Sequence, residues 1–266
     1  MLKLLKYEWK ACARVCLPLY AAVVLLAAVN HLTMNGAVQE MLFGIPTIVL
    51  AMLYTGVMVA VFVVTGVILL QRFYKNLLGD EGYLMFTLPV TVTQHIWSKL
   101  LVAVVMSDIA TLAALLSIGI LFDGMGAMSG FGSLLADLGH LFTGTGHDLL
   151  YMIETAVFLM LTALTGMLFL YLCIALGHLA KKHRVLMAVV WYFVLSTVGQ
   201  SLLMMLFIGA AELGDPVTTL ADFVRGLGPV AGMHVVLLGL CAGMAAVGAA
   251  FFAGTRYILK NRLNLE

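Results

Sequence analysis

The sequence predicts an all-α, polytopic membrane protein with six transmembrane helices, and two observations lead to this fold class. Of the 266 residues, 63% are hydrophobic and only 10% are charged, which excludes an ordinary soluble domain. The apolar residues also gather in runs of about 20, the length that crosses a bilayer core of about 30 Å. Because these runs are continuous rather than alternating, they indicate helices and not barrel strands.

Six runs reach the required length, and together they make residues 1–266 a single transmembrane domain. The first contains Pro18, and the fourth is long enough to tilt or to project from the bilayer. The runs are approximately Val15–Leu32, Pro46–Leu70, Leu100–Phe122, Leu149–Leu179, Val185–Ile208 and Val230–Ala253.

The basic residues predict the orientation of these spans. Of the 14 lysines and arginines, all but Arg225 fall on the side of the spans that carries both termini. Because Lys and Arg are enriched in cytoplasmic loops, both termini are expected in the cytoplasm, in agreement with an even number of spans. The net charge of +1 hides this asymmetry and gives no indication of nucleic-acid binding. The expected location is the cell (plasma) membrane, of a bacterium.

The N-terminal stretch, residues 1–14, has the pattern of an interfacial amphipathic helix. Basic residues recur at spacings of three and four, while Leu2, Leu5, Trp9 and Cys12 follow another face. A helix of this kind lies in the membrane interface. The alternative is the juxtamembrane end of one long helix that includes the first span. The interfacial basic residues are Lys3, Lys6, Lys10 and Arg14.

The segment 71–98, between the second and third spans, is the longest mixed polar stretch and is expected in the cytoplasm. It combines charges and glycines with bulky apolar residues such as Tyr83 and Phe86, which a solvated linker would not need. We therefore expect it to dock onto a protein partner. A helix lying on the lipid surface is the alternative.

Two further segments, 123–148 and 210–228, are expected as outer loops. A short helix on the outer surface is expected in the first, and either a short helix or a surface loop in the second. His140, His147 and Asp148 lie in the first of them, but their spacing is not that of a metal site. The last span contains Gly239-x-x-x-Gly243, a motif that permits close helix contact and that we interpret as internal packing.

Polar residues inside the spans are candidates for a substrate path. Asp108 is expected about 13 Å deep from the inner side and Glu154 about 9 Å deep from the outer side. His234 lies near the level of Glu154 and is its candidate partner, while Gln200 lies in the fifth span. Hydrogen bonding between helices is the alternative role, because buried charge in a membrane needs a partner.

Several catalytic and cofactor-binding patterns are absent from the sequence. It contains no Gly-x4-Gly-Lys-Ser/Thr phosphate loop, no His-Glu-x-x-His and no Gly-x-Ser-x-Gly. We therefore expect no catalytic residue, no metal site and no cofactor in this chain, which is not an enzyme by itself.

One motif in the segment 71–98 resembles a known family. The sequence Asp80-Glu81-Gly82-Tyr83-Leu84-x-x-Thr87-Leu88-Pro89-Val90-Thr91, followed by Ile96-x-Ser98-Lys99-Leu100, is similar to that of permease subunits of type-2 ATP-binding-cassette (ABC) exporters. The opening residues Met1 to Lys10 also look like the start of that family. With six spans and both ends inside, the resemblance covers the whole chain.

The resemblance implies a permease dimer, a homodimer or a pair with a homologous permease, bound to two cytoplasmic ATPase subunits that hold ATP and Mg. It also implies that the segment between the second and third spans forms a coupling helix on the ATPase. The alternatives are an ion- or proton-coupled secondary transporter that uses Asp108 and Glu154, or a membrane immunity or sensor protein without transport. The substrate class stays open among lipids, hydrophobic peptides and drugs. The implied ATPase-coupling residues are Asn76, Gly79, Asp80, Glu81, Gly82, Tyr83, Phe86 and Pro89.

Overall fold

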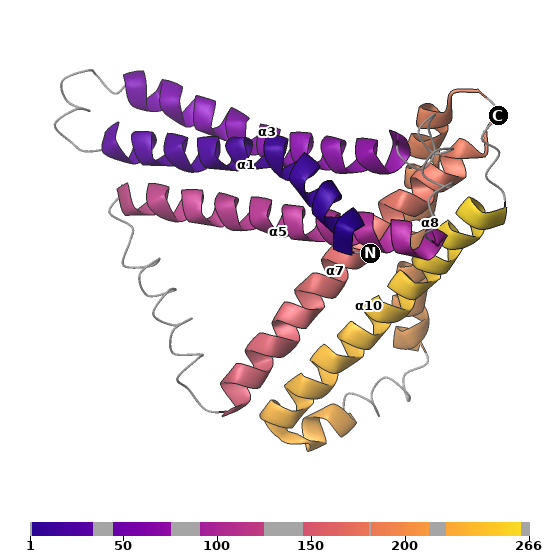
Figure 1. The fold of residues 1–266 in the computed structure, drawn as a ribbon. Helices are drawn as coiled ribbons and strands as arrows, with labels where there is room; N and C mark the ends of the chain where they lie inside the picture. The colour runs from indigo at the N-terminus through magenta and orange to yellow at the C-terminus, as the bar shows by residue number, and fades with distance from the viewer. Residues whose placement is uncertain are drawn as a thin grey trace. The chain divides into compact units, whose positions relative to one another are not determined.

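The computed structural model of the chain describes residues 2–33, 45–75, 91–124, 146–180, 182–212 and 222–261. These ranges are almost entirely helical and contain no strand, and six of their helices are long and apolar enough to cross a membrane (Figure 1). This confirms the predicted all-α fold class with six candidate spans. The helices are α1 (Leu2–Thr33), α3 (Ile45–Phe73), α5 (Val92–Gly124), α7 (Gly146–His178), α8 (Arg184–Glu212) and α10 (Gly228–Asn261).

The contacts divide the chain, which was expected to be one domain, into two compact units. The first consists of Met1–Arg72 and Trp97–Thr143 and contains α1, α3 except Phe73, and α5 from Trp97 onward. The second consists of Phe73–Ile96 and Gly144–Glu266 and contains α7, α8 and α10. The chain therefore enters the second unit after Arg72, returns to the first at Trp97, and leaves it again after Thr143.

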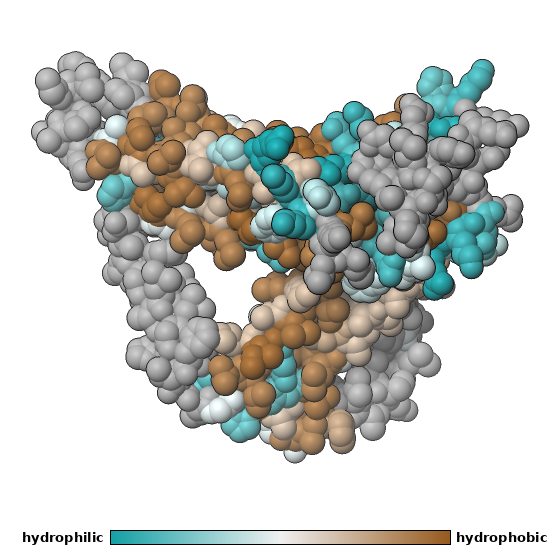
Figure 2. Space-filling view, viewed as in Figure 1, coloured by the Kyte–Doolittle hydropathy of each residue, from teal (hydrophilic) through white to brown (hydrophobic). Residues whose placement is uncertain are grey.

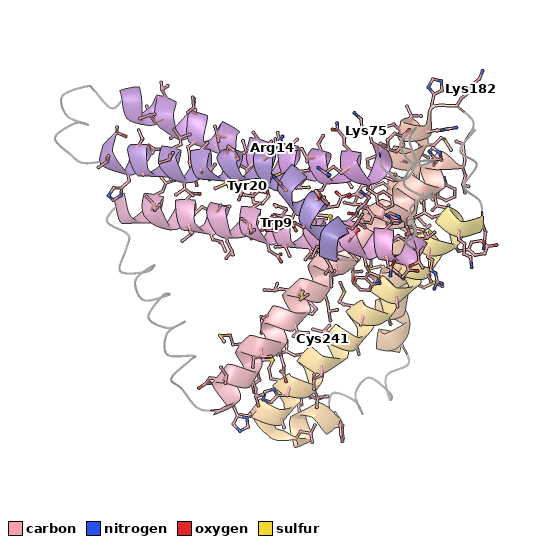
Figure 3. The ribbon with its side chains drawn as sticks, in the orientation of Figure 1. Trp9, Arg14, Tyr20, Lys75, Lys182 and Cys241 are labelled. Atoms are coloured by element: carbon pink, nitrogen blue, oxygen red, sulfur yellow. The ribbon has the colours of Figure 1, made fainter. Side chains whose placement is uncertain are left out.

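Helix α1 is continuous, and it joins the predicted interfacial stretch to the first span. Its N-terminal part, with Trp9 and Arg14, is set at an angle to the rest (Figures 1 and 3). Pro18 lies inside the helix, lacks an N–H, and crowds the carbonyl of Arg14 one turn before it. One bent helix thus combines the two interpretations that the sequence leaves open.

Side-chain hydrogen bonds show how the three helices of the first unit run. The Tyr20 hydroxyl on α1 lies 3.1 Å from Oγ1 of Thr65 on α3 and 3.1 Å from the carbonyl of Met106 on α5. The Tyr54 hydroxyl, near the start of α3, lies 2.9 Å from Oγ of Ser117, near the end of α5. Helix α3 therefore runs antiparallel to α5, and these buried polar groups find partners within the unit.

In the second unit α7 packs against both α8 and α10. A Cβ at Gly177 would lie 2.5 Å from the backbone nitrogen of Ala188, so only glycine permits this approach of α7 to α8. On the other side, Oγ1 of Thr165 donates to the carbonyl of Met244 on α10 at 3.2 Å. Together with the pairs described below, this contact shows that α7 and α10 run in the same direction.

Among the described residues, Gly239 and Gly243 make no close helix contact, whereas Gly248 on the same helix does. A Cβ added at Gly239 or Gly243 would meet no described atom within 4 Å, whereas one at Gly248 would lie 2.9 Å from Oγ1 of Thr165. A four-residue glycine spacing permits close approach but does not determine which face of the helix receives it.

A capping box begins α5 within the polar segment 71–98. The backbone N–H of Gln94 donates to Oγ1 of Thr91 at 3.4 Å, and the N–H of Thr91 donates to Oε1 of Gln94 at 3.1 Å. This reciprocal pair satisfies two donors that a helix start leaves open. It places the first residue of α5 at Val92.

The helix surfaces suit a lipid environment. Apolar side chains cover much of the visible length of the helices (Figure 2), and large exposed residues such as Phe62, Leu112 and Phe193 recur along them. Such a surface would be an aggregation liability in water. The chain is therefore a multi-pass membrane protein.

Candidate functional site

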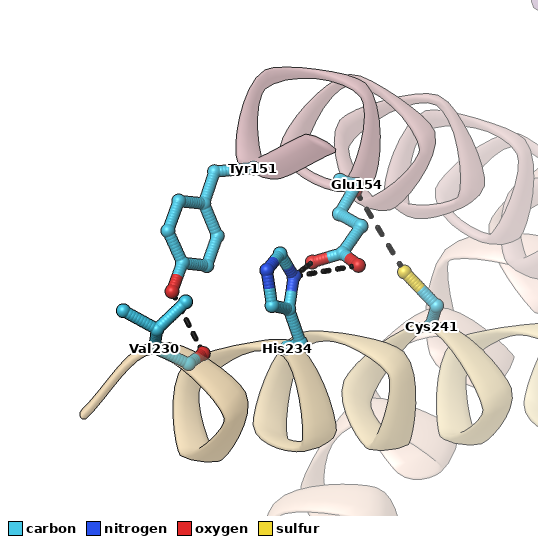
Figure 4. Close-up of polar contacts among 5 residues, drawn as sticks. All are labelled: Tyr151, Glu154, Val230, His234 and Cys241. Atoms are coloured by element: carbon cyan, nitrogen blue, oxygen red, sulfur yellow. Dashed lines mark hydrogen bonds and ion pairs between the residues drawn. The ribbon is translucent and has the colours of Figure 1, made fainter. Parts of the chain in front are cut away.

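Glu154 on α7 and His234 on α10 form a polar pair within otherwise apolar helices. Nδ1 of His234 lies 2.9 Å from Oε1 and 2.8 Å from Oε2 of Glu154 (Figure 4). Their side chains are only 15% and 16% exposed. The pairing predicted from their matching depth is confirmed.

Neighbouring residues hold the imidazole in place. The ring of Tyr151 stacks on that of His234 with centroids 4.2 Å apart, and its hydroxyl donates to the carbonyl of Val230 at 2.7 Å (Figure 4). Tyr151 and Glu154 are three residues apart on α7, and Val230 and His234 are four apart on α10. These spacings bring each pair to one face of its helix, so the two faces contact each other through these four residues.

The contact requires one hydrogen between Nδ1 of His234 and the carboxylate of Glu154. Nε2 of His234 is buried and has no hydrogen-bond partner among the described residues. In the part of the chain that the structure describes, no group of three or more His, Cys, Asp or Glu residues could hold a metal ion.

The other predicted intramembrane residues lie elsewhere. Asp108 is exposed on α5 in the first unit. Gln200 is exposed on α8 in the second unit, where it lines an open groove of about 470 Å³ with Ser201 and Met204. Both positions would face lipid or a partner, and neither decides between a substrate path and helix packing.

The predicted ATPase-coupling residues lie outside the described residues. This holds for Asn76, Gly79, Asp80, Glu81, Gly82, Tyr83, Phe86 and Pro89. Of the predicted interfacial basic residues, Lys6, Lys10 and Arg14 are exposed on α1, and the side chain of Lys3 is outside the described set.

Sequence reasoning missed Glu8, the centre of a second polar cluster, which lies in the first unit. Glu8 is 5% exposed on α1. Its Oε1 lies 2.6 Å from Nζ of Lys99 on α5, and its Oε2 lies 2.8 Å from Nη2 and 3.0 Å from Nε of Arg72 on α3. One signal in the sequence could have found it. Glu8 is a single acid in a basic helix, and Cys12 and Cys16, which are buried, follow it at four-residue spacing on the same face.

No protein-family model, no curated protein and no solved structure matches the chain.

Proposed function

We propose that this protein is the membrane-spanning subunit of an ATP-driven exporter and that a separate ATP-binding subunit powers it. Two copies, or one copy and a homologous permease, would line the substrate path in the cell membrane. ATP and Mg would be bound by the partner and not by this chain.

The observation that carries the proposal is the motif at residues 80–100 and its place in the chain. The motif begins after α3, spans the start of α5 at Val92, and ends with Ser98-Lys99-Leu100 inside α5. This is the position that a loop between the second and third spans needs in order to reach a cytoplasmic ATPase. Its apolar residues and paired acids are suited to binding a protein cleft with a basic rim.

The test is Glu81→Lys, combined with pull-down of the ATP-binding subunit that co-purifies with the wild-type chain. Because residue 81 lies between spans, the variant should insert and fold normally. It should lose ATPase binding, or keep binding while ATP turnover in reconstituted vesicles no longer responds to the permease. Asp222→Lys is the matched control, because Asp222 is an exposed acid whose ion pair with Arg225 lies in another loop region.

Retention of both binding and stimulation by Glu81→Lys and by a Tyr83→Ala/Phe86→Ala variant would contradict the proposal. Residues 71–98 would then be a lipid-surface element.

One observation favours a second candidate, a proton-coupled secondary transporter. Glu154 and His234 place an acid and an imidazole in contact within a span, and ionisable residues in spans occur along the proton paths of transporters. The discriminating result is transport by vesicles that contain the purified chain, lack ATP, and carry an imposed proton gradient. Transport under those conditions would favour the second candidate over the first.

A further inference from the structure

Glu8 connects three helices of the first unit at one end. Its two carboxylate oxygens divide between two partners, Oε1 on Lys99 at the start of α5 and Oε2 on Arg72 at the end of α3. Both oxygens are therefore engaged, and the carboxylate joins α1 to α3 and to α5 at once.

Stability alone does not account for such an arrangement. Burying charged groups costs free energy, and replacing a buried ion pair by apolar residues is often neutral or stabilising. Glu8 and Lys99 are each 5% exposed, so their contact places two charged groups in the interior of the unit. The directional contacts of Glu8 instead specify where the three helices meet.

Arg72 and Lys99 lie in the sequence on either side of a stretch that belongs to the second unit. Arg72 is the last residue before the chain enters the second unit, and Lys99 follows closely after its return at Trp97. Glu8 thus contacts the chain on both sides of residues 73–96, the stretch that belongs to the second unit. The next residue, Phe73, stacks face to face on Tyr171, with ring centroids 3.9 Å apart and planes inclined by 5°.

We infer that Glu8 is a positioning residue that sets the spacing of α3 and α5 at the points where the chain leaves the first unit and returns to it. This inference rests on the proposed function for its biological meaning, because the residues proposed to bind the ATPase lie between α3 and α5 in the sequence. Its structural content can be tested without an ATPase.

The structural test measures the distance between spin labels at Gln71 and Leu101, in a background where alanines replace the four native cysteines. Gln71 is exposed and Leu101 is half-buried, both belong to the first unit, and they lie within two residues of Arg72 and Lys99. In lipid nanodiscs the wild-type cluster should give one narrow distance peak. Glu8→Gln/Lys99→Met should lose that peak and give a broad distribution, and Asp222→Asn, which removes an exposed ion pair elsewhere, should keep it.

A second variant guards against misfolding of the first. Lys99→Met alone leaves the Glu8–Arg72 contact and should also lose the narrow peak, because the α5 start is released. Retention of the peak in both variants would overturn the inference, whatever their thermal stability.

The functional arm uses unlabelled protein with its co-purifying ATP-binding subunit. Glu8→Gln/Lys99→Met should keep ATPase binding, because the coupling residues are unchanged. The stimulation of ATP turnover should fall about 5-fold or more, the scale of a lost coupling between sites. If the wild-type chain binds no ATPase, the proposed function fails while the spin-label result still decides the role of Glu8. If binding and full stimulation persist in the variant, the coupling role of Glu8 is wrong.

Discussion

The imidazole of His234 and the carboxylate of Glu154 form a two-oxygen contact that joins α10 to α7 within their apolar length. Since the two helices run in the same direction, this contact fixes their register as well as their separation. Cys241, further along α10, places its Sγ 3.9 Å from the carbonyl of Glu154 and continues the same line of contacts.

The first prediction concerns the energy of this contact. Glu154→Leu and His234→Leu should each lower the free energy of unfolding in detergent, because each leaves a buried polar group without its partner. The double variant should cost less than the sum, with a coupling energy of about 0.5–2 kcal/mol. Glu154→Leu combined with Gln200→Leu is the control and should be additive, since Gln200 is exposed on α8. Additivity in the Glu154/His234 cycle would show that the two groups do not interact.

The second prediction is a pH dependence that arises at His178, just beyond the fourth candidate span. Burial lowers the pKa of His178 below its ordinary value of 6.5, and the charge of Arg184 lowers it further. Its folded pKa is therefore below its unfolded pKa, so the contribution to stability is complete above pH 6.5 and is lost as the pH falls through the folded pKa. Melting temperatures should consequently drop on acidification from about pH 8 to about pH 5.

The control variant for this effect is His178→Gln, which removes the titrating group. Its melting temperature should depend less on pH than that of the wild type. Arg184→Gln removes the neighbouring guanidinium at 3.3 Å and should raise the pKa of His178 in the folded protein. The drop in melting temperature should then be complete at a higher pH than in the wild type. Equal slopes in His178→Gln and the wild type would locate the pH dependence elsewhere.

The third prediction concerns orientation in the membrane. In a cysteine-free background, cysteines at Ser129 and Thr218 should react with an impermeant reagent added to intact cells, because the basic residues place these segments outside. Cysteines at Asn76 and His183 should react only after the cells are opened. Labelling of position 76 from outside would reverse the topology and remove the basis for a cytoplasmic partner.

The fourth prediction tests the approach of α7 to α8. Gly177→Ala should destabilise the protein by about 1–3 kcal/mol, because the new methyl group would overlap the backbone of Ala188. Gly239→Ala is the matched control: it has open space around it, and alanine is the better helix former, so stability should be unchanged or slightly higher. Thermal unfolding in detergent measures both. Equal effects of the two substitutions would show that α7 and α8 do not pack closely at Gly177.

The six spans and the Glu154–His234 pair were predictable for a common reason. Both follow from position along a helix with a rise of about 1.5 Å per residue, so that depth can be counted from the helix ends. The capping box that begins α5 was also predictable from the sequence, as Thr91-x-x-Gln94.

Glu8 could not be found in this way. Which residues of an N-terminal helix are buried depends on partners distant in sequence, and local amphipathicity predicted an apolar face with Leu5, Trp9 and Cys12. Cys12 is buried as expected, but Trp9 is exposed and Glu8 is buried in its place, because Arg72 and Lys99 provide charges that compensate the acid. For the same reason a glycine motif such as that at Gly239 indicates a possible contact and not its location.

The interleaved units impose an order on synthesis. Phe73 leaves the ribosome well before its stacking partner Tyr171, which follows about 100 residues later. At about 5–20 residues per second this interval lasts about 5–20 s. During that time the first unit can complete its Glu8 contacts, since Lys99 is already made, whereas Phe73 must wait for α7. The nascent chain would therefore form the Glu8 contacts with Arg72 and Lys99 before the helices of the second unit exist, and the ring of Phe73 would meanwhile lack its stacking partner.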